Sequence, residues 1–142
     1  MLVRGSGIRD TDGTFLYLKE VVNYWTQESD LAGNASTGAL QHDEDWFYQN
    51  TPTADHHTGC SVIVIKDSTS LPEGSTGTYT GNDGHVYNTK VIAGMEITIE
   101  PLIETKYRDG TNIPVITDNA LWAVDSDGAR CSYDNDASNA FL

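Results

Sequence analysis

Hydrophobic and polar residues alternate in short runs along much of this chain, and turn residues separate the runs. Met95–Glu100 alternates strictly, which predicts a strand with Met95, Ile97 and Ile99 facing inward and the polar residues facing outward. Ser61–Lys66 is instead a continuous apolar run between turn residues, and this pattern is typical of a buried strand.

Four Asp-Gly dipeptides lie between the runs, at Asp12-Gly13, Asp83-Gly84, Asp109-Gly110 and Asp127-Gly128. Glycine adopts a positive φ without steric cost and aspartate tolerates the left-handed region, so Asp-Gly favours tight hairpin turns. We therefore expect four hairpins: Leu2–Arg9 with Thr14–Val22, Gly77–Thr80 with His85–Ile92, Leu102–Arg108 with Thr111–Ile116, and Ala120–Val124 with Ala129–Tyr133.

Two segments give a less regular pattern. Phe15–Trp25 is rich in aromatic and β-branched residues, which predicts extended chain, with a short helix after Lys19 as the alternative. Residues 26–58 show no clear period and predict a long irregular segment. Long loops of this kind are typically functional, or are ordered by a neighbouring chain.

These elements predict a mostly β fold, namely a single-domain antiparallel β-sandwich or small barrel built from short hairpins. Strands at roughly ten-residue spacing are typical of such folds. The length of 142 residues fits one domain, which we place at residues 1–142, with extended arms at 1–8 and 134–142.

The formal charge is −13, from 21 acidic and 8 basic residues. Such a surface repels phosphate backbones and anionic lipids, so we expect neither nucleic acid nor a membrane as a partner. The chain has no apolar run of about 18 residues and no secretory leader at its start. We therefore expect it in a cytoplasm, with an extracellular location as the alternative.

Paired aspartates are the main candidate metal ligands: Asp10 with Asp12, and Asp125 with Asp127. Calcium prefers several oxygen ligands, although neither pair has the complete pattern of a calcium loop. Turn formation by aspartate explains the same residues. We expect no other cofactor, because Asp55-His56-His57-x-x-Cys60 does not follow a standard zinc spacing.

Trp46, Phe47 and Tyr48 form the clearest aromatic cluster, next to the acidic run Asp43-Glu44-Asp45. Aromatic faces beside carboxylates suit carbohydrate binding, whereas aromatic residues in β domains more often pack in the core. No activated nucleophile and no phosphate-binding glycine loop is recognisable. The sequence therefore favours a protein that is not an enzyme.

Two cysteines, Cys60 and Cys131, leave the redox state open. One disulfide would close a loop of about 70 residues and could stabilise the fold by roughly 4 kcal/mol. Two reduced thiols packed as small hydrophobic groups are the favoured interpretation, because nothing else indicates an oxidising compartment.

Three functions fit these observations. The favoured one is a structural subunit of a macromolecular assembly, which contacts copies of itself, for example in a trimer, and a larger protein shell. Phe141 and Leu142 are its candidate oligomer contacts. In size, acidity and strand content the chain resembles the small decoration (cement) proteins of bacteriophage heads, or other virion β-modules, which implies a virion assembled in a host cytoplasm. The alternatives are a carbohydrate-binding or adhesive β-sandwich, with or without structural calcium, and a small β-barrel enzyme.

Overall fold

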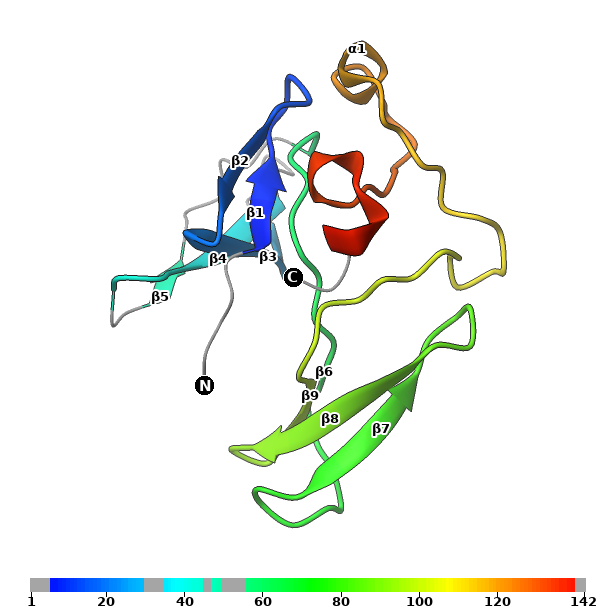
Figure 1. Cartoon of the computed structure of the whole chain (residues 1–142). Coiled ribbons are helices and arrows are strands. Elements are labelled where there is room, and N and C mark those ends of the chain that lie inside the picture. The colour runs from blue at the N-terminus through cyan, green and yellow to red at the C-terminus, as the bar shows by residue number, and fades with distance from the viewer. Residues whose placement is uncertain (1–5, 30–34, 45–46, 50–55, 140–142) are drawn as a thin grey trace. The chain divides into compact units, whose positions relative to one another are not determined.

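The computed structural model describes residues 6–29, 35–44, 47–49 and 56–139, and it is mostly β, as predicted (Figure 1). Within these residues the strands form two open sheets, and neither sheet closes on itself. The chain divides into two compact units. One unit takes the described residues up to Ser61 and again from Pro114, and the other takes Val62–Ile113. The sequence predicts a single domain over residues 1–142, and this stays a prediction.

The first unit contains a five-stranded sheet with the order β2-β1-β3-β4-β5. All neighbours are antiparallel except β1 and β3, which run parallel and pair at Gly7 and Val22. The strands are β1 (Ser6–Arg9), β2 (Phe15–Leu18), β3 (Val21–Ser29), β4 (Ala35–Gln41) and β5 (Phe47–Gln49).

This sheet corrects the prediction of a long irregular segment at residues 26–58, because β4, β5 and the end of β3 lie within it. The strand β4 is hard to recognise from sequence because its buried residues include Ser36 and Thr37. Residues 15–25 are extended, as predicted. A turn interrupts them, in which the N–H of Glu20 donates to the carbonyl of Tyr17 at 3.0 Å.

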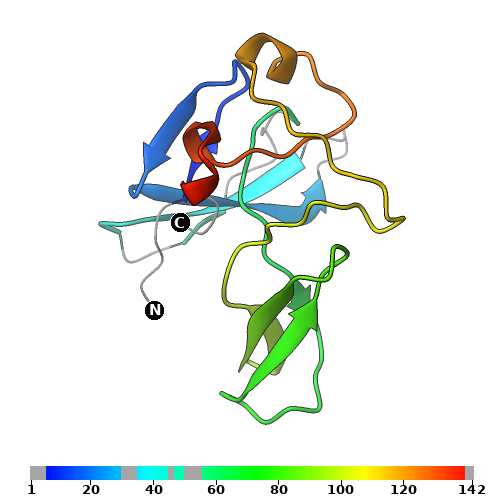
Figure 2. The ribbon, with the colours of Figure 1, turned by 45° about the vertical axis from the view of Figure 1, so that its right-hand side comes forward.

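The second unit contains a four-stranded antiparallel sheet with the order β6-β9-β8-β7 (Figure 1 and Figure 2). Its strands are β6 (Ile65–Lys66), β7 (Thr76–Thr80), β8 (Val86–Ile92) and β9 (Met95–Thr98). The predicted hairpin of Gly77–Thr80 with His85–Ile92 is confirmed, in a register that pairs Thr80 with Val86.

The prediction of a buried strand at Ser61–Lys66 is wrong, since only Ile65–Lys66 is a strand and both residues are exposed. The run is divided between the two units. The N–H of Ser61 donates to Asn23 in the first unit, whereas the carbonyl of Val64 accepts from Thr98 in the second. Continuous hydrophobicity therefore marks a crossing between units here and not the centre of a sheet.

Three of the four Asp-Gly dipeptides form the same turn. In the first, the N–H of Asp10 donates to the carbonyl of Thr14, and the N–H of Gly13 donates back to Asp10. Turns beginning at Gly81 and Tyr107 repeat both bonds. The glycines have φ values of 87°, 92° and 88°. A type I turn closed by a left-handed glycine gives this pattern.

The last two predicted hairpins differ in the structure. Around Asp109-Gly110 the turn forms, but the arms pair only at the isolated bridge of Lys106 with Asn112. The arm predicted at Ala120–Val124 is wrong, because α1 (Asn119–Trp122) occupies it. The Asp118 carboxylate caps this helix by accepting from the N–H of Leu121 at 2.9 Å, a signal that favours a helix start. In the described part of the chain, no helix is long and apolar enough to cross a membrane.

The predicted arms belong in part to the folded first unit. Residues 6–8 lie in β1, and residues 134–139 contain most of two 3₁₀ turns, η1 (Tyr133–Asn135) and η2 (Ala137–Asn139), with Asp136 between them. The side-chain amide of Asn135 donates to the carbonyl of Thr117 at 3.1 Å, and the ring of Tyr133 packs 5.2 Å from that of Phe15. The remainder of both arms, including Phe141 and Leu142, lies outside the described residues.

A buried arginine organises the first unit. Arg9 is only 1% exposed, and its guanidinium lies 4.9 Å from the ring centre of Phe15 and 4.2 Å from that of Trp122. Arg9 donates to the carbonyls of Gly13, Ile116 and Thr117 and to the side-chain oxygen of Asn119. It therefore ties β1 to the segment that returns from the second unit.

Candidate functional site

The buried face of the second sheet is largely polar. Thr89 and Thr98 are each 3% exposed on this face, beside the buried Tyr87 and Val91. The Thr98 hydroxyl accepts from the N–H of Val64 at 3.1 Å, and the Tyr87 hydroxyl accepts from the N–H of Ile103 at 3.0 Å. Each of these polar groups therefore has a partner, which removes most of the cost of burying it.

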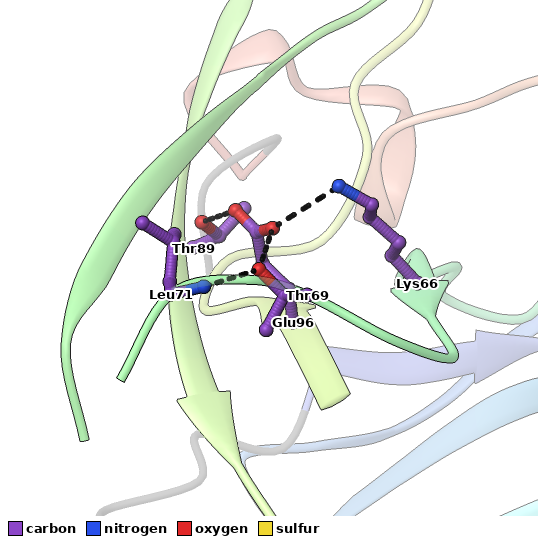
Figure 3. Close-up of polar contacts among 5 residues, drawn as sticks. All are labelled: Lys66, Thr69, Leu71, Thr89 and Glu96. Carbon is purple, nitrogen blue, oxygen red and sulfur yellow. Dashed lines mark hydrogen bonds and ion pairs between the residues drawn. The ribbon is translucent and has the colours of Figure 1, made fainter. Parts of the chain in front are cut away.

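Glu96 lies on the same face, at the centre of a polar cluster (Figure 3). Its carboxylate accepts from the Thr89 hydroxyl at 2.7 Å and the Thr69 hydroxyl at 3.2 Å, and it lies 3.7 Å from the Lys66 ammonium. The hydrogen bond from Thr89 is the main reason that the pKa of Glu96 lies below its ordinary value. The carboxylate is thus held ionised and oriented into the sheet.

The opposite face of this sheet is exposed, and it carries six aliphatic side chains together with Asn88 and Lys90 of β8. Successive strand residues point to opposite faces, so an inward Glu96 and Thr98 send their neighbours outward. The inward orientation predicted for Met95, Ile97 and Ile99 is therefore wrong. The exposed fractions are 48% for Ile65, 54% for Val86, 42% for Ile92 and 51% for Ile99. We call the following set the aliphatic face: Ile65, Val86, Ile92, Met95, Ile97 and Ile99.

The strand register gathers these side chains across three neighbouring strands. Ile65 of β6 pairs with Ile97 of β9, and Ile92 of β8 pairs with Met95. Directly opposite residues in antiparallel strands have side chains in contact range. Lys90 of β8 lies opposite Ile97, and Asn88 and Lys90 stand between Val86 and Ile92, so the aliphatic side chains share this face with two polar ones.

Charge is distributed unevenly between the two units. Residues 62–113 hold four of the eight basic and seven of the 21 acidic side chains, which gives them a formal charge of −3. The remaining residues carry −10. The aliphatic face thus belongs to the part of the chain with the lower charge, where association with another protein meets less repulsion.

Hydrogen bonds place three of the four candidate calcium ligands in turns. Asp10 accepts from the N–H of Thr11, Asp12 from the N–H and hydroxyl of Thr14, and Asp125 from the N–H of Gly128. The Thr14 hydroxyl also lowers the pKa of Asp12. Within the described ranges, no three His, Cys, Asp or Glu side chains come close enough to hold a metal ion. Calcium at Asp10 and Asp12, or at Asp125 and Asp127, stays a prediction.

The predicted aromatic platform is only partly described, because Trp46 lies outside the described residues. Phe47 is 54% exposed and its ring lies against Gly38 of the neighbouring strand. Phe47 and Tyr48 are adjacent in β5, so they point to opposite faces of the sheet. They do not form one platform by themselves, and carbohydrate binding stays a prediction.

Both cysteines are free thiols, as the sequence interpretation favoured. Burial raises the pKa of Cys60 to about 12. Burial also raises the pKa of Cys131, and a hydrogen bond and the charge of Arg9 oppose this effect. Because the thiolate is the reactive form, neither thiol is activated as a nucleophile.

The aliphatic face was missed at the sequence level. In β8, both faces mix polar and apolar residues, so alternation alone does not indicate which face is buried. The deciding contact joins Glu96 to Thr69, which is 27 residues away.

Comparison of the chain with models of known families, with curated proteins and with solved structures finds no match.

Proposed function

We propose that this chain is a structural subunit of a macromolecular assembly, and that it acts through protein–protein contacts made by the aliphatic face. One observation carries the proposal: the second sheet buries a largely polar face, and its exposed face carries six aliphatic side chains beside Asn88 and Lys90. Apolar patches of a few hundred Å² on a monomer are often functional. The wider pattern agrees, since twelve large hydrophobic side chains are exposed among the described residues and five hydrophobic residues are buried.

The free energy expected from burying the aliphatic face favours an assembly of many copies over one tight pair. Fully burying an isoleucine or valine contributes about 1.5–3 kcal/mol, so the exposed halves of Ile65, Val86, Ile92 and Ile99 would contribute on the order of 4 kcal/mol together. Association itself costs at least about 4 kcal/mol. A single contact of this kind is weak, and repeated contacts strengthen it through avidity.

The charge distribution is consistent with such a role. The residues outside 62–113 carry a formal charge of −10, which keeps that part of the subunit hydrated and discourages unspecific aggregation. As the assembly, we propose a virion shell that the subunit decorates. The small size, acidity and strand content of the chain support this setting.

The proposal is tested by measuring mass in solution by sedimentation from about 1 μM to about 1 mM, the range in which weak contacts become populated. We expect species heavier than the 15.5 kDa monomer. A double variant of the aliphatic face, Ile65→Ser with Ile99→Ser, should shift association to at least about tenfold higher concentration, equivalent to about 1.4 kcal/mol.

The matched control is Leu121→Ser with Val124→Ser, two exposed residues of the first unit. This control should associate as the wild type does, and thermal melting should show that both double variants are folded. A chain that remains strictly monomeric throughout the concentration range contradicts the proposed function. Equal effects of the two double variants would show that the aliphatic face is not the contact.

A further inference from the structure

The strand β7 forms one edge of the second sheet: among the strands that the structure describes, β8 lies on one side of it and none lies on the other (Figure 1 and Figure 2). Hydrogen bonds at both ends of the β7–β8 ladder fix which residues face β8. The N–H of Val91 donates to Ser75 at 3.0 Å, and the N–H of Gly81 donates to His85 at 2.8 Å. Antiparallel ladders alternate, so residues 77 and 79 also bond to β8.

It follows that Thr76, Thr78 and Thr80 direct their N–H and carbonyl groups away from the sheet. Among the described residues, none of these six groups has a hydrogen-bond partner. Such a row of free groups is a template for pairing with another strand. The edge of β7 is therefore open along its whole length.

This edge also lacks the features with which proteins usually block strand pairing. Lysine, proline, bulges and very short strands protect exposed edges. β7 reads Thr-Gly-Thr-Tyr-Thr, without charge or proline, and its register with β8 is unbroken over all five residues. The opposite edge of the same sheet is protected, because β6 is two residues long and ends in Lys66.

The pattern of β7 is self-complementary. An antiparallel copy centred on Thr78 places Thr78 opposite Thr78 of the second copy, and Thr76 opposite its Thr80. All six free groups then pair, and threonines face one another on the exposed face, where cross-strand threonine pairs are favourable. On the other face Tyr79 comes opposite Gly77, so two bulky side chains do not collide.

We propose that β7 pairs with β7 of a second copy of this chain about a two-fold axis at Thr78, which joins the two four-stranded sheets into one. This inference rests on the proposed function and deepens it by naming the first partner. Interfaces about a two-fold axis are self-complementary, as this edge is. The resulting dimer differs from the trimer expected from the sequence.

The pairing also enlarges the aliphatic contact. An axis normal to the sheet keeps the aliphatic faces of both copies on the same side. In one copy, the four most exposed residues of the aliphatic face present on the order of 300 Å². Two joined copies therefore present on the order of 600 Å² to further copies or to the shell, which approaches the area of about 800 Å² per partner in a standard interface.

Cysteine cross-linking tests the register directly. With Thr78→Cys, the two introduced thiols lie on residues roughly 5.5 Å apart at Cα, which a disulfide can span. With Thr76→Cys, or with Thr80→Cys, the equivalent residues are about 14 Å apart and cannot be bridged. We expect Thr78→Cys to form a covalent dimer at least about tenfold faster than either control, because pairing raises the effective thiol concentration.

Two further results make the cross-linking test specific. A mixture of the Thr76→Cys and Thr80→Cys proteins should cross-link, because Thr76 faces Thr80 of the second copy. Mass spectrometry of the linked peptides separates these products from any that involve Cys60 or Cys131. Cross-linking at Thr78 that is no faster than at Thr76 overturns the proposed register.

A second measurement does not depend on new thiols. Thr78→Pro removes an N–H that faces away from β8, so it leaves the β7–β8 ladder intact, while the proline ring blocks an approaching strand. Thr78→Val is the matched control that keeps the N–H. We expect dimers for the wild type and Thr78→Val, and a folded monomer for Thr78→Pro up to at least about tenfold higher concentration.

The two proposals fail in different ways. If Thr78→Pro associates as the wild type does while Ile65→Ser with Ile99→Ser does not, the edge pairing is wrong and the proposed function stands. If the wild-type chain forms a trimer, the edge pairing is likewise wrong and the proposed function stands. A wild-type chain that is monomeric throughout overturns both proposals.

Discussion

Replacing Arg9 with methionine should destabilise the first unit more than any other single substitution of a basic residue in the described chain. The guanidinium is buried between Phe15 and Trp122, and its four hydrogen bonds go to oxygens of Gly13 and residues 116–119. Methionine reproduces the arginine side chain only as far as Nε. The substitution therefore keeps the packing of the aliphatic stem and removes the guanidinium with its hydrogen bonds, its charge and its contacts with the two rings.

The magnitude follows from the acceptors that lose their donor. Each buried carbonyl left unsatisfied costs about 1–3 kcal/mol, although those of Ile116 and Thr117 are only partly buried and can gain water. Contact of the cation with two aromatic rings adds about 1 kcal/mol. Release from the cost of burying a charge offsets part of the loss. We expect a net decrease in the free energy of unfolding of about 3–5 kcal/mol, as for other substitutions that break a buried hydrogen-bond network.

Urea unfolding followed by tryptophan fluorescence measures this decrease, since Trp122 lies 4.2 Å from the guanidinium. With a slope of about 2 kcal/mol per M, the midpoint should fall by about 2 M. Arg9→Lys keeps the charge but reaches fewer carbonyls, so it should lose about half as much. Arg108→Met, at an exposed position, is the control. A loss below about 1 kcal/mol for Arg9→Met would refute the reasoning, because ordinary surface substitutions cost that little.

Three further predictions concern thiols, acid and a turn. Because burial raises the pKa of Cys60 to about 12, a thiol reagent at pH 8 should label it far more slowly in the folded protein than in urea, and equal rates would contradict its burial. The hydrogen bond from the Thr111 hydroxyl holds the pKa of Asp109 below its ordinary value of 3.8. The ionised Asp109 therefore stabilises the fold above pH 3.8, and this stabilisation is lost as the pH falls through the lower pKa of the folded state. On acidification, the melting temperature of Asp109→Asn should decrease less than that of the wild type. Gly84→Ala should lower the free energy of unfolding in urea by about 1–2 kcal/mol, because Gly84 has a φ of +92°, which alanine adopts only with strain. The added methyl group meets no neighbouring atom, so backbone strain alone is measured. An unchanged midpoint would show that the turn relaxes freely.

The parts of the fold that the sequence predicted are those determined locally. An Asp-Gly turn needs only a glycine at positive φ and an aspartate whose carboxylate accepts a hydrogen bond from the residue that follows the glycine. Asp109 accepts such a bond from the N–H of Thr111. The β7–β8 hairpin follows from its turn, because turn type sets the register of the strands. No distant residue is needed for either prediction.

The parts that the sequence did not predict depend on distant contacts or on polar residues in buried positions. The strand β4 buries Ser36 and Thr37, which composition alone assigns to a loop. In Ser61–Lys66 the apolar run is real, but its hydrogen-bond partners belong to two different units. For the candidate site, alternation correctly separated the two faces of β9 and assigned the wrong one to the interior. The contact that decides this, from Glu96 to Thr69, spans 27 residues.

One glycine in β7 makes room for the inward position of Glu96. A Cβ atom at position 77 would lie 2.6 Å from the Glu96 carboxylate and 2.9 Å from the Thr89 hydroxyl, so a side chain there would compete with the polar cluster for the same space. Gly77 leaves that space free, and the carboxylate fills it. Because strand side chains alternate, fixing Glu96 inward also fixes Ile97 and Ile99 outward. The same five-residue strand therefore contributes to both proposed contacts: its glycine makes room for the inward Glu96, and its threonines leave the edge open.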